Sequence, residues 1–298
     1  MGNPRERVGV HHDRDGGQVL IGQSKAAACG LVVLLQEVMK NIVHQEYFYV
    51  RSEDVFGHEL VLRKEECRHL VRSLRKKIGD SVFAVDGNGK RYKVRIRKMG
   101  RSEVVAEILR TEEMAGESRI ELTLAQGMIK GSRLDWLVEK ATELGVKRIV
   151  PVRTKHSNVQ SLSANRMSRL RKIALSAMKQ SGRSVLPAIE PVQTLDRLLE
   201  GASGHDLRLL AHPDSENLPS RPKRIPEIKI LRVLCLVGPE GGLENVEIQK
   251  AMDCDFQPIS LGARRLRSET AGLALVVWVL SQFDGWHPRL TVPASDCR

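Results

Sequence analysis

Aromatic residues are scarce in this sequence, at 4% of its 298 residues. Proteins that bind single-stranded nucleic acid on an open sheet stack the bases on several Phe and Tyr rings, so the sequence fits that class poorly. The five cysteines are scattered, and none forms a CxxC pair or combines with a nearby pair of histidines. This spacing argues against a disulfide framework and against a metal site, and it favours a reducing, cytoplasmic location.

The sequence also lacks an apolar run long enough to cross a membrane. The only such run near the amino terminus, 26–39, is interrupted by Gln36 and Glu37 before it reaches the roughly 18–20 residues that a spanning helix needs. The same run has no convincing cleavage site for a signal peptide. Residues 1–45 are therefore predicted to be an N-terminal extension that is disordered, or whose residues before Met39 come from a mis-called start.

Two nucleotide-binding motifs are missing as well. The sequence contains neither GxGxxG nor GxxxxGK[ST]. The dinucleotide-dependent dehydrogenases and the P-loop nucleotidases therefore lose their strongest sequence support.

Positive charge is what the sequence has in excess. It contains 48 Lys and Arg against 36 Asp and Glu, a formal net charge of +12 at pH 7. A strongly basic chain points toward a polyanionic partner. Because 41% of the residues are hydrophobic, the chain is able to bury a core, and its length favours two domains.

The first domain is predicted over 46–115, as a small, partly closed β-barrel with one helix. Apolar residues from Cys67 to Ile78 recur at helical spacing, and Gly79 is expected to end that helix. A Gly-Asn-Gly turn at 87–89 predicts a hairpin. The predicted strands are 81–86, 90–98 and 103–109.

This domain carries most of the excess charge. Between Arg63 and Arg110 there are 15 Lys and Arg against 6 Asp and Glu, a net charge of +9. In 90–98 apolar and basic residues alternate strictly, which predicts a strand with one buried face and one fully basic face that few acidic neighbours offset. We therefore expect this strand and the helix to contact RNA or DNA phosphates. The residues expected to do so are Arg68, Arg72, Arg75, Arg91, Lys93, Arg95 and Arg97.

The second domain is predicted over 119–285, with a tail at 286–298. Strands alternate with helices, which indicates a mostly parallel sheet covered on both faces. The predicted strands are 120–126, 146–152, 207–211, 228–237 and 256–261. The predicted helices are one capped by Ser132 and others at 163–180, 244–252 and 268–283, and 212–226 is predicted to be a surface loop.

Two turns at strand ends are the places to look for chemistry, because ligands of open α/β sheets lie beyond the carboxyl ends of the strands. The first is GPEGG at 238–242, whose glycines let the backbone approach a ligand closely. The second is LGARRLRSETA at 261–271, in which Ser268 is predicted to cap the next helix and Glu269 suits its N-terminus. Taken singly, each turn is equally consistent with a tight loop before a well-capped helix.

Five ordered motifs resemble one family, the 16S rRNA uridine-N3 methyltransferases of the SPOUT superfamily. The similarity spans nearly everything from Tyr47 to Phe283. The motifs are HLVRSLRKKIGD at 69–80, LAQGMIKGSRLDWLVEKATELG at 124–145, QSGR at 180–183, GPEGG at 238–242 and LGARRLRSETA at 261–271. Their number and their order across both domains make the resemblance specific.

The resemblance implies an α/β protein with an N-terminal PUA-like RNA-binding barrel and a C-terminal SPOUT domain whose chain forms a trefoil knot. It further implies a homodimer with its active site at the subunit interface, S-adenosylmethionine as cofactor, and 16S rRNA in the small ribosomal subunit as partner. The cofactor-binding residues that it implies are Val237, Gly238, Pro239, Glu240, Gly241, Gly242, Ser260, Leu261, Gly262, Leu266, Arg267 and Thr270.

The implied reaction is methyl transfer to N3 of one uridine, position 1498 in the family's rRNA numbering. Such a transfer mainly needs positioning, but the N3 proton must also leave. Arg267 and Glu240 are the expected catalytic residues, and Arg267 would stabilise negative charge on the ring. The candidates for a general base are Glu240, Glu269 and His156, and His156 also fits an ordinary loop histidine. Further expected RNA contacts are Lys130, Arg133 and Arg183.

Four positions depart from the usual family pattern. Tyr47 stands where Arg is common, His156 replaces a frequent Arg, Lys179 replaces a frequent Glu, and Arg265 stands where Ile is usual. The cofactor turns are otherwise intact, so these differences bear on the choice of RNA site more than on the methyl donor.

Two other functions stay open on the sequence. The first is the same chemistry on another rRNA or tRNA nucleotide. The second is a ribosome-assembly factor that binds RNA without catalysis, and the intact glycine-rich turns argue against it.

Overall fold

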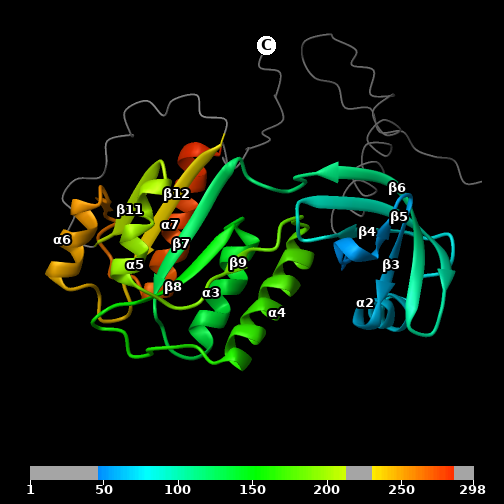
Figure 1. Ribbon diagram of the computed structural model, residues 1–298, viewed down its shortest axis with the longest axis horizontal. Coiled ribbons are helices and arrows are strands. Elements are labelled where there is room, and N and C mark those ends of the chain that lie inside the picture. Colours follow the sequence, from blue (N-terminus) through cyan, green and yellow to red (C-terminus); the bar gives the residue numbers. More distant parts are fainter. Residues whose placement is uncertain (1–45, 213–229, 285–298) are drawn as a thin grey trace, which may run out of the picture. The chain divides into compact units, whose positions relative to one another are not determined.

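The computed structural model describes residues 46–212 and 230–284, which form two β-sheets with associated helices (Figure 1). The predictions made for 1–45, for most of the loop 212–226 and for the tail 286–298 fall outside these residues. Within the described part of the chain, no helix is both long and apolar enough to cross a membrane.

The first sheet has six strands in the order β1-β4-β5-β6-β3-β2. Only β1 and β4 pair in parallel, and the other pairs are antiparallel. The strands are β1 (Tyr47–Tyr49), β2 (Val55–Phe56), β3 (Glu59–Arg63), β4 (Ser81–Val85), β5 (Lys90–Met99) and β6 (Glu103–Glu113), and a 3-10 turn covers Ser52–Asp54. The three predicted strands are confirmed as β4, β5 and β6. The first three strands were missed because segments of two to five residues are too short to show a period.

This sheet curls around a single hydrophobic core, which we call the barrel core. The strict alternation predicted for β5 is confirmed, because Tyr92, Val94 and Ile96 are buried while the basic residues between them face outward. Side chains from β1, β3, β4 and β6 join the same core, and so does the buried Cys67. Burial raises the pKa of the Cys67 thiol, as expected of a cysteine that acts as a packing residue.

The predicted helix from Cys67 to Ile78 is shorter than its apolar spacing suggested. An α-helix α2 (Lys64–Arg68) continues into a π-helical turn η2 (His69–Ser73). Leu74, directly after this turn, still packs partly buried against the barrel core. Arg75 then takes a left-handed conformation with φ of 51°, and Ile78 is 63% exposed. The helix therefore ends well before Gly79.

The second sheet is entirely parallel, as predicted. Its order is β10-β8-β7-β12-β11-β13, and β9 also pairs with β8. The strands are β7 (Ile120–Gly127), β8 (Arg148–Arg153), β9 (Ala188–Ile189), β10 (Gln193–Thr194), β11 (Leu207–Ala211), β12 (Leu231–Val237) and β13 (Gln257–Ile259). All five predicted strands are present, and β9 and β10 were missed because they have two residues each.

Five α-helices accompany this sheet: α3 (Ser132–Glu143), α4 (Ala164–Ser181), α5 (Leu195–Glu200), α6 (Asn245–Asp253) and α7 (Ser268–Phe283), with a 3-10 turn at Ala202–Gly204. The four predicted helices are confirmed, and the six-residue α5 was missed. Ser163 caps α4 by accepting a hydrogen bond from the backbone N–H of Arg166. Ser132 is not a cap, because Gly131 occupies that position in α3.

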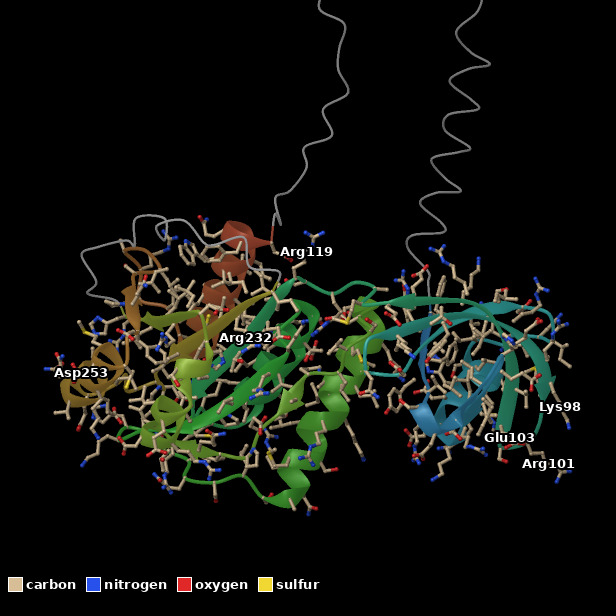
Figure 2. The ribbon with its side chains drawn as sticks, turned by 45° about the horizontal axis from the view of Figure 1, so that its top comes forward. Lys98, Arg101, Glu103, Arg119, Arg232 and Asp253 are labelled. Atoms are coloured by element: carbon tan, nitrogen blue, oxygen red, sulfur yellow. The ribbon has the colours of Figure 1, made fainter. Side chains whose placement is uncertain are left out.

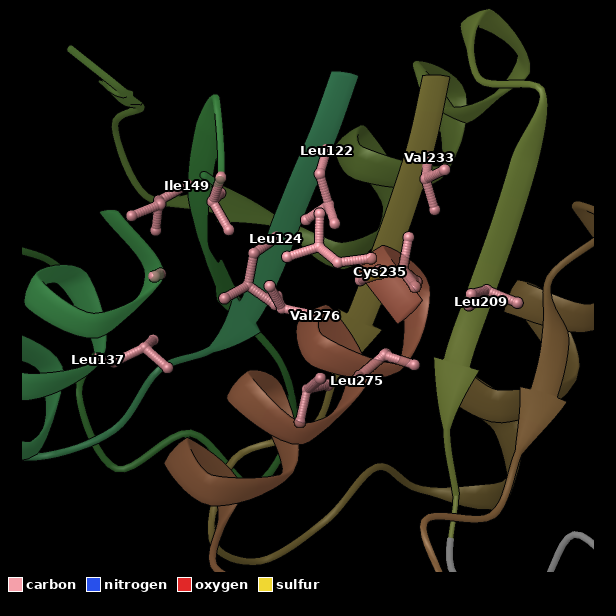
Figure 3. Close-up of a cluster of buried hydrophobic side chains, with 14 of the residues drawn as sticks. Leu122, Leu124, Leu137, Ile149, Leu209, Val233, Cys235, Leu275 and Val276 are labelled. Atoms are coloured by element: carbon pink, nitrogen blue, oxygen red, sulfur yellow. The ribbon is translucent and has the colours of Figure 1, made fainter. Parts of the chain in front are cut away.

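Both faces of the parallel sheet are covered. In β12, Val233 and Cys235 belong to a core cluster that includes residues of α3, α4 and α7, whereas Leu234 and Leu236 belong to a cluster on the other face with α5 and α6. Figure 3 shows Cys235 among the buried side chains of the first cluster. Burial raises the pKa of its thiol strongly, so Cys235 acts as an apolar residue. The mixed α/β class is confirmed.

Candidate functional site

The two turns singled out in the sequence meet in the structure. One follows β12 and the other follows β13, and these strands flank β11 in the sheet. Together with the end of β11 they line a cavity of about 560 Å³. This volume lies within the range of ordinary ligand sites.

Most of the predicted cofactor residues line this cavity. They are Val237, Gly238, Pro239, Glu240, Gly241, Gly242, Leu261, Gly262, Leu266 and Arg267. Ser260 and the exposed Thr270 do not line it. The sequence reasoning missed Ala211, His212, Leu243, Arg264, Arg265, Ser268 and Ala271, and assigned Arg133 to RNA alone. No local signal marks Ala211 and His212, because only the strand order brings the end of β11 between the two turns.

The first turn lies directly against the end of β7. A Cβ atom added at Gly127 would be 2.4 Å from the backbone nitrogen of Pro239. Any side chain at this position would therefore push the turn away from the sheet. Gly262, in the second turn, has φ of +102°, a conformation that favours glycine, and no atom lies within 4 Å of where its Cβ would be.

Ser268 ties three segments of the site together. Its hydroxyl donates a hydrogen bond to the backbone oxygen of Gly238, and it accepts one from Nε2 of Gln126 at 2.7 Å. The end of β7, the first turn and the start of α7 are thus joined through one buried side chain. The predicted capping role is wrong: the N-cap of α7 is Arg267, and Ser268 is the first helical residue.

Three charged side chains from separate segments meet beside the cavity. Nη1 of Arg133, in the first turn of α3, lies 3.1 Å from Oε1 of Glu240, and the backbone N–H of Lys130 lies 3.4 Å from the same oxygen. Nε of Arg133 is 3.9 Å from Oε1 of Glu269. Arg133 and Glu240 line the cavity, whereas Glu269 is 7% exposed and does not. We call Arg133, Glu240 and Glu269 the carboxylate cluster.

Two oxygens of the carboxylate cluster have no donor. Oε2 of Glu240 and Oε2 of Glu269 are both buried and have no hydrogen-bond partner among the residues that the structure describes. A buried carboxylate oxygen without a partner is expensive, so the cluster suits a ligand that brings an N–H group or a positive charge.

His156 contacts the backbone of the first turn without lining the cavity. Its Nδ1 lies 3.1 Å from the carbonyl oxygen of Gly241, so this nitrogen carries the hydrogen and donates. Its Nε2 lies 3.6 Å from Oε1 of Glu244. His156 does not line the cavity, so the alternative of a loop histidine fits it better than a role as general base.

The outward face of β5 carries basic side chains, but some of them are paired with carboxylates of β6. Carboxylates of β6 lie beside it. Glu112, opposite Arg91 in the sheet register, accepts from its Nε at 2.8 Å, and Glu107, opposite Arg95, lies with its Oε2 2.6 Å from Arg97. The prediction of few acidic neighbours is therefore wrong. Among the residues described in the structure, only Lys93 and Arg95 of the four predicted contacts on β5 have neither a hydrogen bond nor an ion pair. The hairpin end carries further charges at Lys98, Arg101 and Glu103 (Figure 2).

The other predicted RNA contacts divide into exposed and buried ones. The basic residues beside η2 and at the start of α3 are exposed, namely Arg68, Arg72, Arg75, Lys130 and Arg133. Arg183 is different, because its side chain is 3% exposed and pairs with the fully buried Glu117. Its remaining N–H groups donate to the backbone oxygens of Thr142 and Val146. The expectation that Arg183 contacts RNA is therefore wrong, since its donors are already used inside the protein.

The cavity has features that suit S-adenosylmethionine. Two turns expose backbone N–H and C=O groups for an adenine ring, and the carboxylate cluster holds two acidic groups against one arginine beside the same space. Among 46–212 and 230–284, no three His, Cys, Asp or Glu side chains are grouped to hold a metal ion.

Comparisons with known proteins match both domains of the chain. A model of an RNA methyltransferase domain matches residues 116–280, and a model of an RNA methyltransferase PUA domain matches residues 62–109. The ribosomal RNA small subunit methyltransferase E of Aquifex aeolicus is 31% identical over 241 residues, which cover 76% of this chain and 95% of that protein. The enzyme of the same name from Bacillus subtilis is 28% identical over 220 residues, covering 70% and 84%.

A solved structure is similar over nearly the same span. It is the ribosomal RNA small subunit methyltransferase E of Neisseria gonorrhoeae bound to S-adenosyl methionine, with a TM-score of 0.72 and 29% identity. The match covers 82% of this chain and all of that one.

Proposed function

This chain belongs to the RNA methyltransferase family, and from that premise we propose that it methylates N3 of a uridine in 16S rRNA of the small ribosomal subunit, at position 1498 in the family's numbering. S-adenosylmethionine is the proposed methyl donor and the cytoplasm the proposed location. The observation that carries the proposal is the cavity between the turns 238–242 and 261–268, at the carboxyl edge of a parallel sheet.

The ten predicted cofactor residues that line the cavity are the ones we propose to hold S-adenosylmethionine. Its sulfonium supplies an already activated methyl group, so the protein mainly has to position the acceptor. Backbone groups of Gly238 to Gly242 and of Leu261 and Gly262 would bind the adenine. Arg267 lines the same cavity, where its charge would stabilise a negatively charged uracil ring.

RNA is proposed to bind along the exposed basic residues. The supporting observation is that Lys93 and Arg95 on β5, with Arg72 and Arg75 beside η2, point charge toward solvent. A surface cation without an ion pair binds phosphate at little cost in free energy, because no ion pair with a carboxylate has to break first.

The family's trefoil knot and homodimer are parts of the same proposal. The turns 238–242 and 261–268 are separate in the chain yet line one cavity, as segments of one knot would. Trp136, on α3 beside the cavity-lining Arg133, is 44% exposed. Tryptophan is among the residues enriched where protein subunits meet, so its exposure beside the site supports this part of the proposal.

The decisive experiment is a methylation assay. Purified protein is incubated with labelled S-adenosylmethionine and unmethylated small subunits, and the product is mapped by mass spectrometry of nuclease fragments. Label on N3 of the proposed uridine supports the proposal. Label elsewhere keeps the chemistry and moves the target to another nucleotide, and no label on subunits, free rRNA or tRNA favours a non-catalytic RNA-binding factor.

The location of the cofactor is tested separately by calorimetry. Gly127→Ala forces the first turn away from β7 and so displaces backbone groups that line the cavity, and we expect S-adenosylmethionine affinity to fall by about tenfold or more, equivalent to about 1.4 kcal/mol. Gly204→Ala is the matched control, because no atom lies within 4 Å of the added Cβ. Equal affinities of the two variants would move the cofactor away from this cavity.

A further inference from the structure

The carboxylate cluster has more hydrogen-bond acceptors than donors. Arg133 and the backbone N–H of Lys130 both serve one oxygen of Glu240, and the second oxygen of Glu240 has no partner in the part of the chain that the structure describes. That second oxygen is buried, so a ligand meets it when the Glu240 side chain turns toward the cavity. Glu240 therefore offers one acceptor to a ligand in the cavity that it lines.

Arg133 offers donors at the same place. Its side chain is 45% exposed and lines the cavity, and only one of its nitrogens, Nη1, makes a hydrogen bond to another described residue, Glu240. Glu240 and Arg133 thus present an acceptor next to a donor, both charged, and hydrogen bonds to charged groups are the stronger ones.

Uracil carries the complementary pattern. Its N3–H is a donor, and each neighbouring carbonyl oxygen is an acceptor. Cytosine has no proton on N3 and would place a lone pair against the carboxylate, which is repulsive. A site built for one hydrogen-bond pattern rejects a base that lacks it, because buried polar groups are then left unpaired.

We propose that Glu240 accepts the N3 proton of the target uracil while Arg133 donates to an adjacent uracil carbonyl, so that the pair both selects uracil and activates it. This inference rests on the proposed function. In the step, the N–H bond breaks and the proton moves to the Glu240 carboxylate, while the N3 electron pair forms a bond to the methyl carbon. The bond from that carbon to sulfur breaks, and its electrons stay on sulfur as a neutral thioether.

Glu240 suits this role better than its neighbour Glu269. Glu240 lines the cavity and its side chain is 26% exposed, whereas Glu269 does not line it and is 7% exposed. Glu269 lies against Nε of Arg133 and so acts as a positioning residue for the guanidinium.

The test separates methyl-donor binding from methyl transfer. For Glu240→Gln, which keeps the shape but not the basicity, we expect a single-turnover methylation rate on small subunits about 10² to 10⁴ times lower than wild type when S-adenosylmethionine is saturating for both proteins. For Arg133→Gln we expect a rate lower by about 10² to 10³. Glu139→Gln, on the same helix as Arg133 but outside the cavity, is the control.

A more acidic substrate gives a readout that a structural defect would not move. Fluorine on C5 of uracil makes the N3 proton more acidic, so it leaves with less help from a base. On subunits reconstituted with 5-fluorouridine-substituted rRNA, the rate deficit of Glu240→Gln should shrink by about tenfold or more. Glu240→Asp, which keeps the acid but shortens its reach, serves if the Gln variant does not fold.

Several results would overturn the inference. They are a Glu240→Gln variant with the wild-type rate at saturating S-adenosylmethionine, a deficit that stays unchanged on fluorouridine, or a loss that appears in Glu269→Gln instead. If the wild-type protein methylates uridine N3 and Glu240→Gln does so equally well, only this inference fails. If the wild type places no methyl group on N3, both proposals fail.

Discussion

Arginines in two regions of this protein were expected to do the same thing, and the structure separates them. On β5, Arg97 forms a half-exposed ion pair with β6, Arg91 forms a less exposed one, and Arg95 is exposed without one among the described residues. At the start of the segment after α4, Arg183 is buried against Glu117. The charge is identical in both regions, but water screens it in one and is absent from the other. Solvation therefore decides whether an arginine is available to a partner or belongs to the core.

Breaking the buried pair should have the largest effect. Arg183→Met leaves the Glu117 carboxylate uncompensated in a site with no exposure, so the free energy of unfolding should fall by about 3–5 kcal/mol. Urea unfolding measures this change. The control is Arg171→Met, since Arg171 is exposed and unpaired among the described residues, with a change within about 0.5 kcal/mol. A loss below about 1 kcal/mol for Arg183→Met would contradict the comparison.

On the exposed face the effect should fall on RNA binding instead of stability. Replacing Lys93 and Arg95 by Gln together should reduce the magnitude of the slope of log affinity against log salt concentration by about 1.4–1.8. This is the change expected when two fewer phosphates are neutralised and their counterions are no longer released. The matched variant replaces Arg91 and Arg97 by Gln and should change the slope less, because carboxylates already hold these residues. Equal slopes in the two double variants would mean that the ion pairs open on binding.

An ion pair of intermediate burial should have an intermediate effect. Lys179 lies 2.6 Å from Glu66, and their side chains are 24% and 14% exposed. Lys179→Glu, which restores the residue frequent in the family, places two carboxylates together and should cost about 1–2 kcal/mol. Adding Glu66→Lys reverses both charges and should recover most of the loss. A double-mutant cycle measures the interaction free energy between residues 66 and 179. A value near zero would show that burial does not determine how much an ion pair contributes to stability.

The smallest expected effect is the pH dependence that His205 gives to the stability of the protein. Burial lowers the pKa of His205 below its ordinary 6.5, with smaller contributions from Arg148, Arg208 and Arg232, and the hydrogen bond that its Nδ1 donates to the backbone oxygen of Ala202 opposes them. The folded state then resists protonation, so the stabilising contribution is present above pH 6.5 and is lost as the pH falls below it. Denaturant unfolding between pH 5 and pH 7.5 should therefore show less pH dependence in His205→Gln, and an unchanged profile would contradict this.

Much of the fold could be predicted from periodicity. The bounds of β11 and α7 agree with the sequence prediction to the residue, because each is a sustained apolar pattern with clear ends. The failures are short segments such as β9 and β10, and the helix before Gly79, where a π-turn breaks the period that the prediction relied on.

The site could be predicted only in part. The turn at 238–242 is visible as a cluster of glycines after an apolar strand, and its lining of the cavity is confirmed. Arg133 gave no sign of its partners, which lie 107 and 136 positions further along the chain at Glu240 and Glu269. Carboxylates opposite β5 were overlooked for the same reason, since they are paired by sheet register and not by proximity in sequence.

The sequence by itself determined the two-part α/β organisation, the parallel sheet, the strand with one basic face and the two turns that carry the chemistry. These are local properties, because apolar spacing and glycine content depend on neighbours a few residues away. The tertiary structure decided which charges are free, that Ser268 joins Gln126 to Gly238, and that Arg183 is a core residue. Those outcomes depend on burial and on contacts between distant segments, and a side chain's role follows from the water and the partners that the fold leaves it.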